Sequence, residues 1–354
     1  MKKISSVELL RCISSFMILI WHYQHFYIAF NKFSSVNVIN NIKIQPLFNS
    51  LAFFYEHGSL GVQIFFTISG FVFSYIYFQR TNESLLKEFV VNRFARLYPL
   101  HFLTLIIVLL TQVYSLNKFG NYQINSINDT YHFILNFFFI SGWGFEKSYS
   151  FNGPIWSVSI ELIIYALFFI SLINLRKNRF YQALIIFIIL LFLRKTNISV
   201  YLDVLKFKLI IIDCGILFYS GVLIYLFFNK FKNSNIQLIT SLILIFLSFN
   251  GNFKVFLFCP GLLLLFLSFE KYINNFFKKI FNTLGNLTYG MYLWHFPLQI
   301  GCIMLLYNLG IDTKIYLTKE FLLLYLMSVS MIALLSFIFF EKKLNIFIRK
   351  KLLS

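Results

Sequence analysis

The residues best suited to chemistry at the start of this chain are Arg11 and His22, which lie in one apolar segment, Val7 to Ile28. They are eleven residues apart, close to three helical turns, so a helix would present both on one face, roughly 16 Å apart along its axis. An ionisable side chain inside a bilayer must face a protein interior or a wet cavity, and by default it marks a site. We therefore expect a polar site along the first helix, with Arg11 near the membrane edge and His22 deeper.

A second pair of cations, Arg93 and Arg96, stands at positions i and i+3 beside an apolar stretch. On one helical face, two guanidinium groups form a fork suited to phosphate, because they stay charged and offer paired hydrogen-bond donors. The alternative is that both only anchor the cytoplasmic end of a span. Because Arg11 is expected on the same side of the membrane, the three arginines predict a site for a polyanionic, nucleotide-like molecule.

Polar residues also interrupt two later apolar segments. Glu161 lies about two turns inside a segment that begins near Pro154, where a carboxylate needs a histidine or arginine partner; a purely structural ion pair is the alternative. Thr288, Tyr292 and His295 share one helical face by their spacing. This stripe predicts a lined cavity, although a single histidine of this kind is more often a hydrogen-bonded interior residue.

Small residues stand among bulky aromatics in the run from Gly58 to Phe71. On a helix they let neighbouring backbones approach closely, which is the simpler interpretation. The functional alternative is that this close approach narrows a cavity around His22. We name Ser69 from this run, and Ser157 from the apolar segment that begins near Pro154, as candidate cavity-lining residues.

The elements that must position these residues are membrane-spanning helices, because 59% of the residues are apolar and only 12% are charged. We predict an all-α, polytopic transmembrane helical bundle of about ten spans, with Tyr131 to Ile140 as a lateral or re-entrant piece. The predicted spans are Val7 to Ile28, Leu60 to Phe78, Leu97 to Leu116, Ile155 to Leu175, Tyr181 to Leu193, Leu209 to Phe228, Ile236 to Phe249, Phe253 to Phe269, Leu284 to Leu306 and Phe321 to Phe340.

Charge sets the expected orientation. Most of the 31 Lys and Arg residues fall in segments that are cytoplasmic if the N-terminus is inside, so both termini are predicted to be cytoplasmic. The net charge of +18 is spread over short loops, so it indicates topology and contact with anionic membrane lipid, and no nucleic acid is expected as a partner. The four cysteines are scattered through apolar spans, and we predict no metal site and no bound cofactor.

Five runs, in this order, resemble the integral-membrane acyltransferase 3 family, whose members modify bacterial surface polysaccharides and other extracytoplasmic acceptors. They are the pair Arg11 and His22 with ten residues between, the GVxxFFxxSGF-like run 61–71, the RxxRLxP-like run 93–99, the WSxxxE run 156–161 and the SYxxYLxH-like run 288–295. Thr288 stands where the family usually has serine, and Glu341 is followed by lysine where many members have proline. Residues 1–345 are taken as the family's transmembrane domain and 346–354 as a short basic cytoplasmic tail. The chain resembles the stand-alone branch, without an appended SGNH-type domain, so a separate acceptor-side protein is a possible partner.

The resemblance implies an O-acyltransferase of the bacterial cytoplasmic (inner) membrane. It would move an acyl group, commonly acetyl, from cytosolic acyl-CoA as co-substrate to a hydroxyl of an extracytoplasmic or lipid-linked polysaccharide or oligosaccharide. In this scheme His22 is the general base, because the pKa of histidine suits that role. Glu161 would orient or charge-balance it, and Arg11, Arg93 and Arg96 would bind the donor's phosphates. Tyr292 and His295 join the serines as cavity-lining candidates.

Two other functions fit part of the pattern. A transporter or flippase for a polyprenyl-linked sugar would also need many spans, buried charge and an aromatic-rich cavity, but it predicts internal repeats, which the sequence does not show. The other membrane O-acyltransferase family also centres on an intramembrane histidine. That histidine typically lies late in the chain, as His295 does here, and it would leave Arg11 and His22 unexplained.

Overall fold

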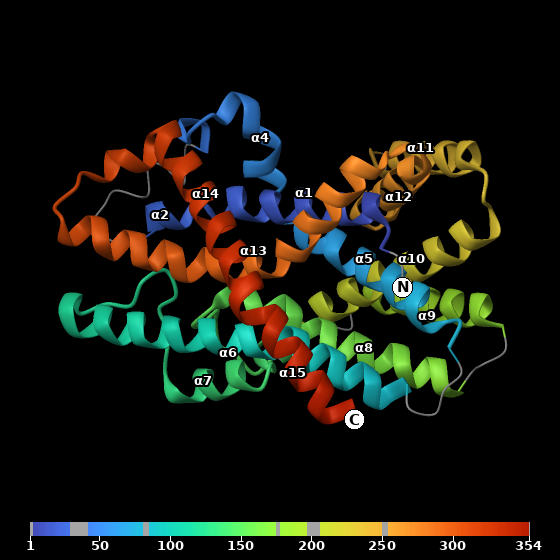
Figure 1. The fold of residues 1–354 in the computed structure, drawn as a ribbon, viewed down its shortest axis with the longest axis horizontal. Coiled ribbons are helices and arrows are strands. Elements are labelled where there is room, and N and C mark those ends of the chain that lie inside the picture. Colours follow the sequence, from blue (N-terminus) through green and yellow to red (C-terminus); the bar gives the residue numbers. More distant parts are fainter. Residues whose placement is uncertain are drawn as a thin grey trace.

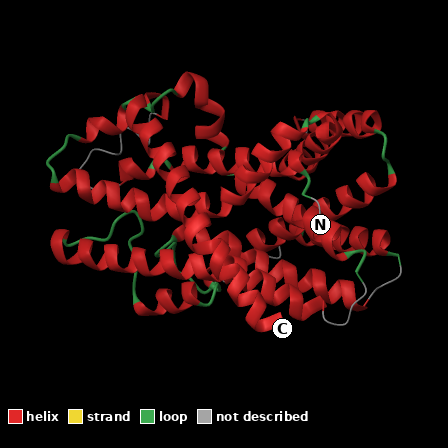
Figure 2. Cartoon of the chain, viewed as in Figure 1, coloured by secondary structure: helices red, strands yellow, loops and turns green. Residues whose placement is uncertain are grey.

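The computed structural model describes residues 3–28, 42–80, 85–174, 178–196, 206–249 and 254–353, and this part of the chain is helical without strands (Figure 2). The longer helices are α1 (Ser5–His22), α4 (Phe48–His57), α5 (Leu60–Tyr77), α6 (Leu85–Phe119), α8 (Trp156–Asn174), α9 (Arg179–Lys195), α10 (Lys206–Lys230), α11 (Ser234–Phe249), α12 (Lys254–Phe269), α13 (Asn275–Asn308), α14 (Lys319–Ser336) and α15 (Lys342–Leu353). The short ones are α2 (His25–Ile28), α7 (Thr130–Phe137), η1 (Ile42–Ile44), η2 (Ser141–Trp143), η3 (Gly153–Ile155), η6 (Glu270–Tyr272), η7 (Thr313–Leu317) and the π-helical turn η8 (Phe337–Glu341).

Six helical segments in the described residues are long and apolar enough to cross a bilayer, so the protein is a multi-pass membrane protein. They are Leu60–Tyr77, Leu86–Phe119, Gly153–Leu172, Leu209–Lys230, Lys254–Tyr272 and Lys319–Leu353. The all-helical membrane fold is therefore confirmed, whereas the count of ten spans and the side of each terminus stay predictions. The predicted boundaries at Leu175 and Phe253 lie outside the described residues.

Large apolar side chains on the outer helix surfaces support the same conclusion. Phe246 and Phe249 of α11 are 66% and 70% exposed, and Met327 of α14 is 69% exposed. Side chains of this size on a water-facing surface would form a patch favouring aggregation, whereas lipid tails solvate them well.

Helices α1 and α13 run side by side through the middle of the molecule, although they come from opposite ends of the chain (Figure 1). Their close approach depends on Gly285, because a Cβ there would lie 1.8 Å from Oε2 of Glu8. The contact carries the Arg11 to His22 stripe of α1 against the Thr288 to His295 stripe of α13. Two of the sequence motifs therefore meet along one helix interface.

The glycines of the run 61–71 act as close-contact points, as the simpler interpretation expects. A Cβ on Gly61 would lie 2.5 Å from the Ser14 carbonyl oxygen of α1, and one on Gly70 would lie 1.8 Å from the Phe218 carbonyl oxygen of α10. In the same way, a Cβ on Gly221 of α10 would lie 1.9 Å from the Thr67 carbonyl oxygen of α5. Small residues thus let α5 lie between α1 and α10 at backbone contact.

Several elements differ from the predicted segments. The first span breaks after His22, and a short turn leads into α2. Helix α6 begins at Leu85, twelve residues before the predicted start at Leu97, so Arg93 and Arg96 lie within a helix that continues through Pro99. At the other end, α14, η8 and α15 form one continuous helical rod that places residues 346–353 beside α6 (Figure 1). The piece predicted at 131–140 does not differ in this way, because it overlaps α7, whose 8 residues are too few to cross a bilayer, as expected for a lateral or re-entrant piece.

Candidate active site

A cavity of about 430 Å³, which we call the arginine cavity, opens between α1, α5, α6, α8, α13 and α15. Five arginines from four separate parts of the chain line it: Arg11, Arg80, Arg93, Arg96 and Arg349. Glu161 is the only acidic side chain among the lining residues in the described part of the chain. The cavity therefore carries a positive excess, which suits an anionic ligand.

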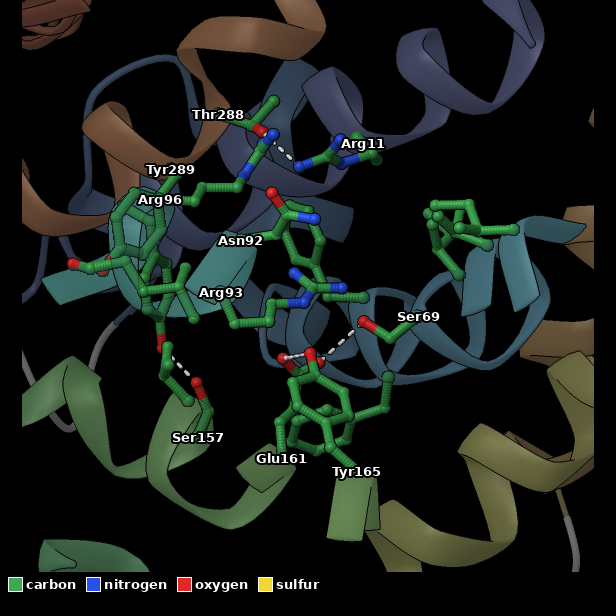
Figure 3. A pocket seen from close by; sticks show the side chains of 18 of the residues that line it. Arg11, Ser69, Asn92, Arg93, Arg96, Ser157, Glu161, Tyr165, Thr288 and Tyr289 are labelled. Atoms are coloured by element: carbon green, nitrogen blue, oxygen red, sulfur yellow. Dashed lines mark hydrogen bonds between the residues drawn. The ribbon is translucent and has the colours of Figure 1, made fainter. Parts of the chain in front are cut away.

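Arg11 and Arg96 converge from α1 and α6 next to Thr288 of α13 (Figure 3). Arg11 donates from Nη1 to Glu8 Oε2 over 3.2 Å and from Nη2 to Thr288 Oγ1 over 3.2 Å. Thr288 keeps the hydroxyl that a serine would supply at this position. Arg96 forms no ion pair within the described residues, and its side chain is exposed to the cavity. Its guanidinium is available to a ligand.

Arg93 lies between the Arg11 and Arg96 pair and the carboxylate of Glu161 (Figure 3). Its guanidinium carbon is 4.4 Å from the centre of the Phe73 ring and 5.0 Å from that of Tyr165, so cation–π contacts hold it. Glu161 accepts hydrogen bonds from Ser69 Oγ at 2.9 Å and from the Tyr165 hydroxyl. Aromatic rings and two hydroxyls thus fix the two charged groups in a predefined geometry.

A second cavity of about 260 Å³, the histidine cavity, lies at the other end of α1. It is lined by Trp21, His22 and His25, by aromatic side chains from the segments around 149–156 and 296, and by Asp213 of α10. Arg194 Nε donates to Asp213 Oδ1 over 2.7 Å, so this acid is already paired.

The two cavities share three lining residues, Val62, Phe66 and Tyr292. Val62 and Phe66 are one turn apart on α5 and both are buried. Together with Tyr292, these side chains form part of the wall between the two cavities. The arginine cavity and the histidine cavity are therefore adjacent chambers.

His22 is fixed by a partner from α13. Its Nδ1 lies 2.9 Å from Nε2 of His295, and the two rings are nearly parallel, with centroids 4.9 Å apart. Gln299 Nε2 donates to the His22 carbonyl oxygen over 2.8 Å, and Gln299 Oε1 accepts from His25 Nδ1 at 3.2 Å. Within the described residues, Nε2 of His22 has no hydrogen-bond partner. Nε2 is therefore the nitrogen of the His22 ring that can form a hydrogen bond with a ligand.

Ser157 and Tyr292 bind each other. The Tyr292 hydroxyl donates to the Pro154 carbonyl oxygen over 2.6 Å, so the Ser157 hydroxyl, 2.8 Å away, is left to donate to Tyr292. In the described part of the chain, no histidine or carboxylate contacts Ser157 Oγ. Among the described residues, the partners of the Tyr292 hydroxyl are Ser157 and the Pro154 carbonyl oxygen, so neither hydroxyl has an adjacent base there to activate it as a nucleophile.

The predicted site residues thus fall into two groups. The arginine cavity brings together Arg11, Ser69, Arg93, Arg96, Ser157, Glu161 and Tyr292. His22 and His295 are joined to each other, with His22 lining the histidine cavity. Glu161 does not meet His22, because it lines the other cavity and its hydrogen bonds go to α5 and α8.

The structure adds residues that the sequence pattern did not single out. His25 and Gln299 follow His22 and His295 by three and four positions, so the rule that such residues share a helical face could have found them. Arg80, Asn345 and Arg349 line the arginine cavity, but only the packing of α15 against α6 brings Asn345 and Arg349 there.

The family model and the curated protein that match this chain both describe acyltransferases. A family model described as an acyltransferase domain matches residues 4–341, which includes both cavities apart from Asn345 and Arg349. A peptidoglycan O-acetyltransferase from Listeria monocytogenes is 27% identical over 291 residues, which are 68% of this chain and 45% of that protein. The chain thus spans less than half of the length of this curated relative. No solved structure matches. Because the family model covers nearly the whole chain, the protein belongs to the acyltransferase 3 family of integral membrane proteins.

Proposed function

We propose that this protein is an O-acyltransferase of the bacterial inner membrane that moves an acyl group, acetyl in the first instance, from cytosolic acyl-CoA to a hydroxyl of an extracytoplasmic or lipid-linked glycan. One observation carries the proposal: a cation-lined chamber and a histidine-lined chamber meet at Val62, Phe66 and Tyr292. A transferase needs one place for its donor and another for its acceptor, with the reacting atoms at the boundary.

The arginine cavity supplies the donor site in this proposal. Arg11 and Arg96 converge, and Arg93 lies beside them, so the diphosphate of acyl-CoA would receive several charge-assisted hydrogen bonds. With the expected topology, this cavity faces the cytosol, where acyl-CoA is found. The pantetheine arm then extends past Val62 and Phe66 toward His22.

His22 supplies the base. A proton on Nδ1 donated to His295 Nε2 leaves Nε2 of His22 basic and facing the histidine cavity. As the acceptor oxygen forms its bond to the thioester carbonyl carbon, Nε2 takes the hydroxyl proton. The carbon–sulfur bond then breaks, the proton passes from Nε2 to the departing thiolate, and the products are the ester and free coenzyme A.

Glu161 acts on the donor side. Arg93 and Arg11 are both close enough for their charges to act on it, and its fixed position beside Arg93 orients that guanidinium for a phosphate. We therefore assign Glu161 to charge balance among the arginines, and His295 with Gln299 to the positioning of His22.

Transfer is proposed to be direct, from donor to acceptor. Ser157 and Tyr292 could carry an acyl group only after losing a proton, yet the groups that contact their hydroxyls are each other and the Pro154 carbonyl. For the acceptor, the curated relative is a peptidoglycan O-acetyltransferase, so peptidoglycan glycan is one member of the acceptor class to be tried.

The test uses purified protein in detergent with radiolabelled acetyl-CoA and two acceptors, a lipid-linked oligosaccharide extract and soluble peptidoglycan fragments. We expect label in one glycan with the wild type, none with His22→Ala, and a raised KM for acetyl-CoA with Arg11→Ala. His57→Ala, on the exposed surface of α4, is the matched control and should behave as wild type. Movement of lipid-linked sugar across vesicles without any acetyl transfer would overturn the proposal in favour of a flippase.

A further inference from the structure

The outer part of the arginine cavity contains two arginines that have no role so far, Arg80 and Arg349. Arg80 follows the end of α5 by three residues, and Arg349 comes from α15, close to the end of the chain. Asn345, one turn before Arg349 on α15, lines the same cavity. Helix α15 therefore presents one polar face to the cavity while it packs beside α6.

The position of the arginines along the cavity divides them into two groups. Val62 and Phe66, which also line the histidine cavity, lie in the first two turns of α5, whereas Arg80 follows the last residue of that helix and so lies at its far end. Arg80, Arg93 and Arg349 are all close enough to Tyr77, at the end of α5, for their charges to act on its hydroxyl. Arg11 and Arg96 instead converge beside Thr288 of α13 (Figure 3). The cavity thus has an inner pair, Arg11 and Arg96, and an outer pair, Arg80 and Arg349, with Arg93 between them.

The outer pair can accept an anion at little cost. Arg80 Nη1 lies 3.1 Å from Glu88 Oε2, but the two side chains are 42% and 32% exposed, so this ion pair contributes little and can rearrange. Arg349 forms no ion pair among the described residues, and its side chain is exposed. Two guanidinium groups with spare donors suit a terminal phosphate, which carries nearly two charges and three acceptor oxygens.

We propose that Arg80 and Arg349 bind the phosphomonoester on the ribose of the acyl-CoA donor, while Arg11 and Arg96 bind its diphosphate. This inference rests on the proposed function. Coenzyme A carries its two kinds of phosphate at opposite sides of one ribose, and the pantetheine arm leaves from the diphosphate. Because that arm must reach His22, the diphosphate lies at the inner pair and the phosphomonoester at the outer pair. Helix α15 is then part of the donor site and selects coenzyme A over donors that lack the ribose phosphate.

The experiment compares acetyl-CoA with 3′-dephospho-acetyl-CoA as donors for the full-length protein in vesicles of phosphatidylcholine. We expect the wild type to prefer acetyl-CoA at least tenfold in kcat/KM. In Arg349→Gln this preference should fall to threefold or less, mainly through a higher KM for acetyl-CoA. Lys350→Gln, an exposed neighbour on α15 that does not line the cavity, should keep the wild-type preference.

Other outcomes overturn the inference. Equal use of both donors by the wild type would show that no group reads the ribose phosphate, while leaving acyl transfer itself intact. A preference that survives both Arg349→Gln and Arg80→Gln would place the phosphate elsewhere. If adding phosphatidylglycerol to the vesicles changes wild-type kinetics, and Arg349→Gln removes that change without affecting donor preference, the outer pair binds a lipid headgroup instead. If the wild type transfers acetyl from neither of the two donors, the result would contradict the proposed function.

Discussion

The two cavities on α1 are adjacent but differ in how their charges are balanced. In the histidine cavity, Asp213 is matched by Arg194 at 2.7 Å, and the imidazole of His22 is matched by that of His295 at 2.9 Å. In the arginine cavity, Arg93 and Arg96 have no carboxylate within ion-pair distance in the described residues. Unpaired cations in a membrane protein are costly, so they mark the place where an anion is expected.

This contrast separates two tasks. The chamber with excess charge is suited to hold a polyanionic molecule, which brings its own compensating charge. The chamber with internal pairs is suited to move a proton, because its groups are already oriented and nearly neutral. Variants at each end should therefore change different kinetic constants.

The largest effect is expected for His22→Ala. Removal of a general base typically costs about 10²- to 10⁴-fold in rate, so acetyl transfer should fall by at least about a hundredfold. Because the arginine cavity is untouched, the Kd for radiolabelled coenzyme A, measured by equilibrium dialysis, should stay within twofold. A variant that loses coenzyme A binding together with transfer would break the division between the two cavities.

Arg96→Gln should show the opposite pattern, with weaker donor binding and an almost unchanged rate of the chemical step. Hydrogen bonds to charged groups contribute about 1.5–3 kcal/mol each, so KM for acetyl-CoA should rise by roughly 10- to 100-fold while kcat stays within threefold. Arg96→Lys should recover part of the loss, since it keeps the charge but not the paired donors. Steady-state kinetics at varied acetyl-CoA would decide, and a lowered kcat with unchanged KM would assign Arg96 to the chemical step.

The meeting of Arg11 with Arg96 could be predicted from the sequence, because both lie near the same predicted membrane edge and both belong to apolar helices. The pairing of Glu161 with His22 could not. Glu161 is five residues into α8 from Trp156, which lines the histidine cavity, so about 7.5 Å of helix rise carries it toward the arginine end. The sequence gives the depth of a residue along its own helix, but the relative depth of two helices depends on packing.

The extent of α6 and the role of α15 show the same limit. Hydropathy marks where a helix enters lipid, and α6 continues beyond that point as a charged helix beginning at Leu85. Residues 346–354 look like a basic tail by composition, whereas 346–353 lie in a helix whose Arg349 reaches the cavity. The motifs identified residues that line the two cavities, and the tertiary packing of helices distant in sequence decided which polar groups share each cavity.

Gln299→Ala should have a moderate effect confined to the histidine end. The variant removes the hydrogen bond to the His22 carbonyl and the acceptor for His25, so kcat should fall about tenfold, with KM for acetyl-CoA unchanged. Gln299→Glu, which still accepts from His25 but cannot donate to His22, should behave like the alanine variant. Leu305→Ala on the exposed side of α13 is the control. An increase in KM equal to the fall in kcat/KM would show that Gln299 supports the donor site instead.

The smallest effect is expected at the boundary between the cavities. Ser157→Ala removes one hydrogen bond to Tyr292, and the Tyr292 hydroxyl keeps its bond to the Pro154 carbonyl, so kcat should stay within about threefold. Mass spectrometry of protein quenched during turnover should find no acetyl group on Ser157 or Tyr292, because no base from the described helices contacts either hydroxyl. An acetylated peptide containing Ser157, together with loss of transfer in Ser157→Ala, would mean that the boundary itself carries the acyl group. The reaction would then use three sites: the arginines for the donor, Ser157 for a covalent acyl-enzyme intermediate, and His22 for the acceptor. In that case His22 would activate the acceptor only after coenzyme A has left.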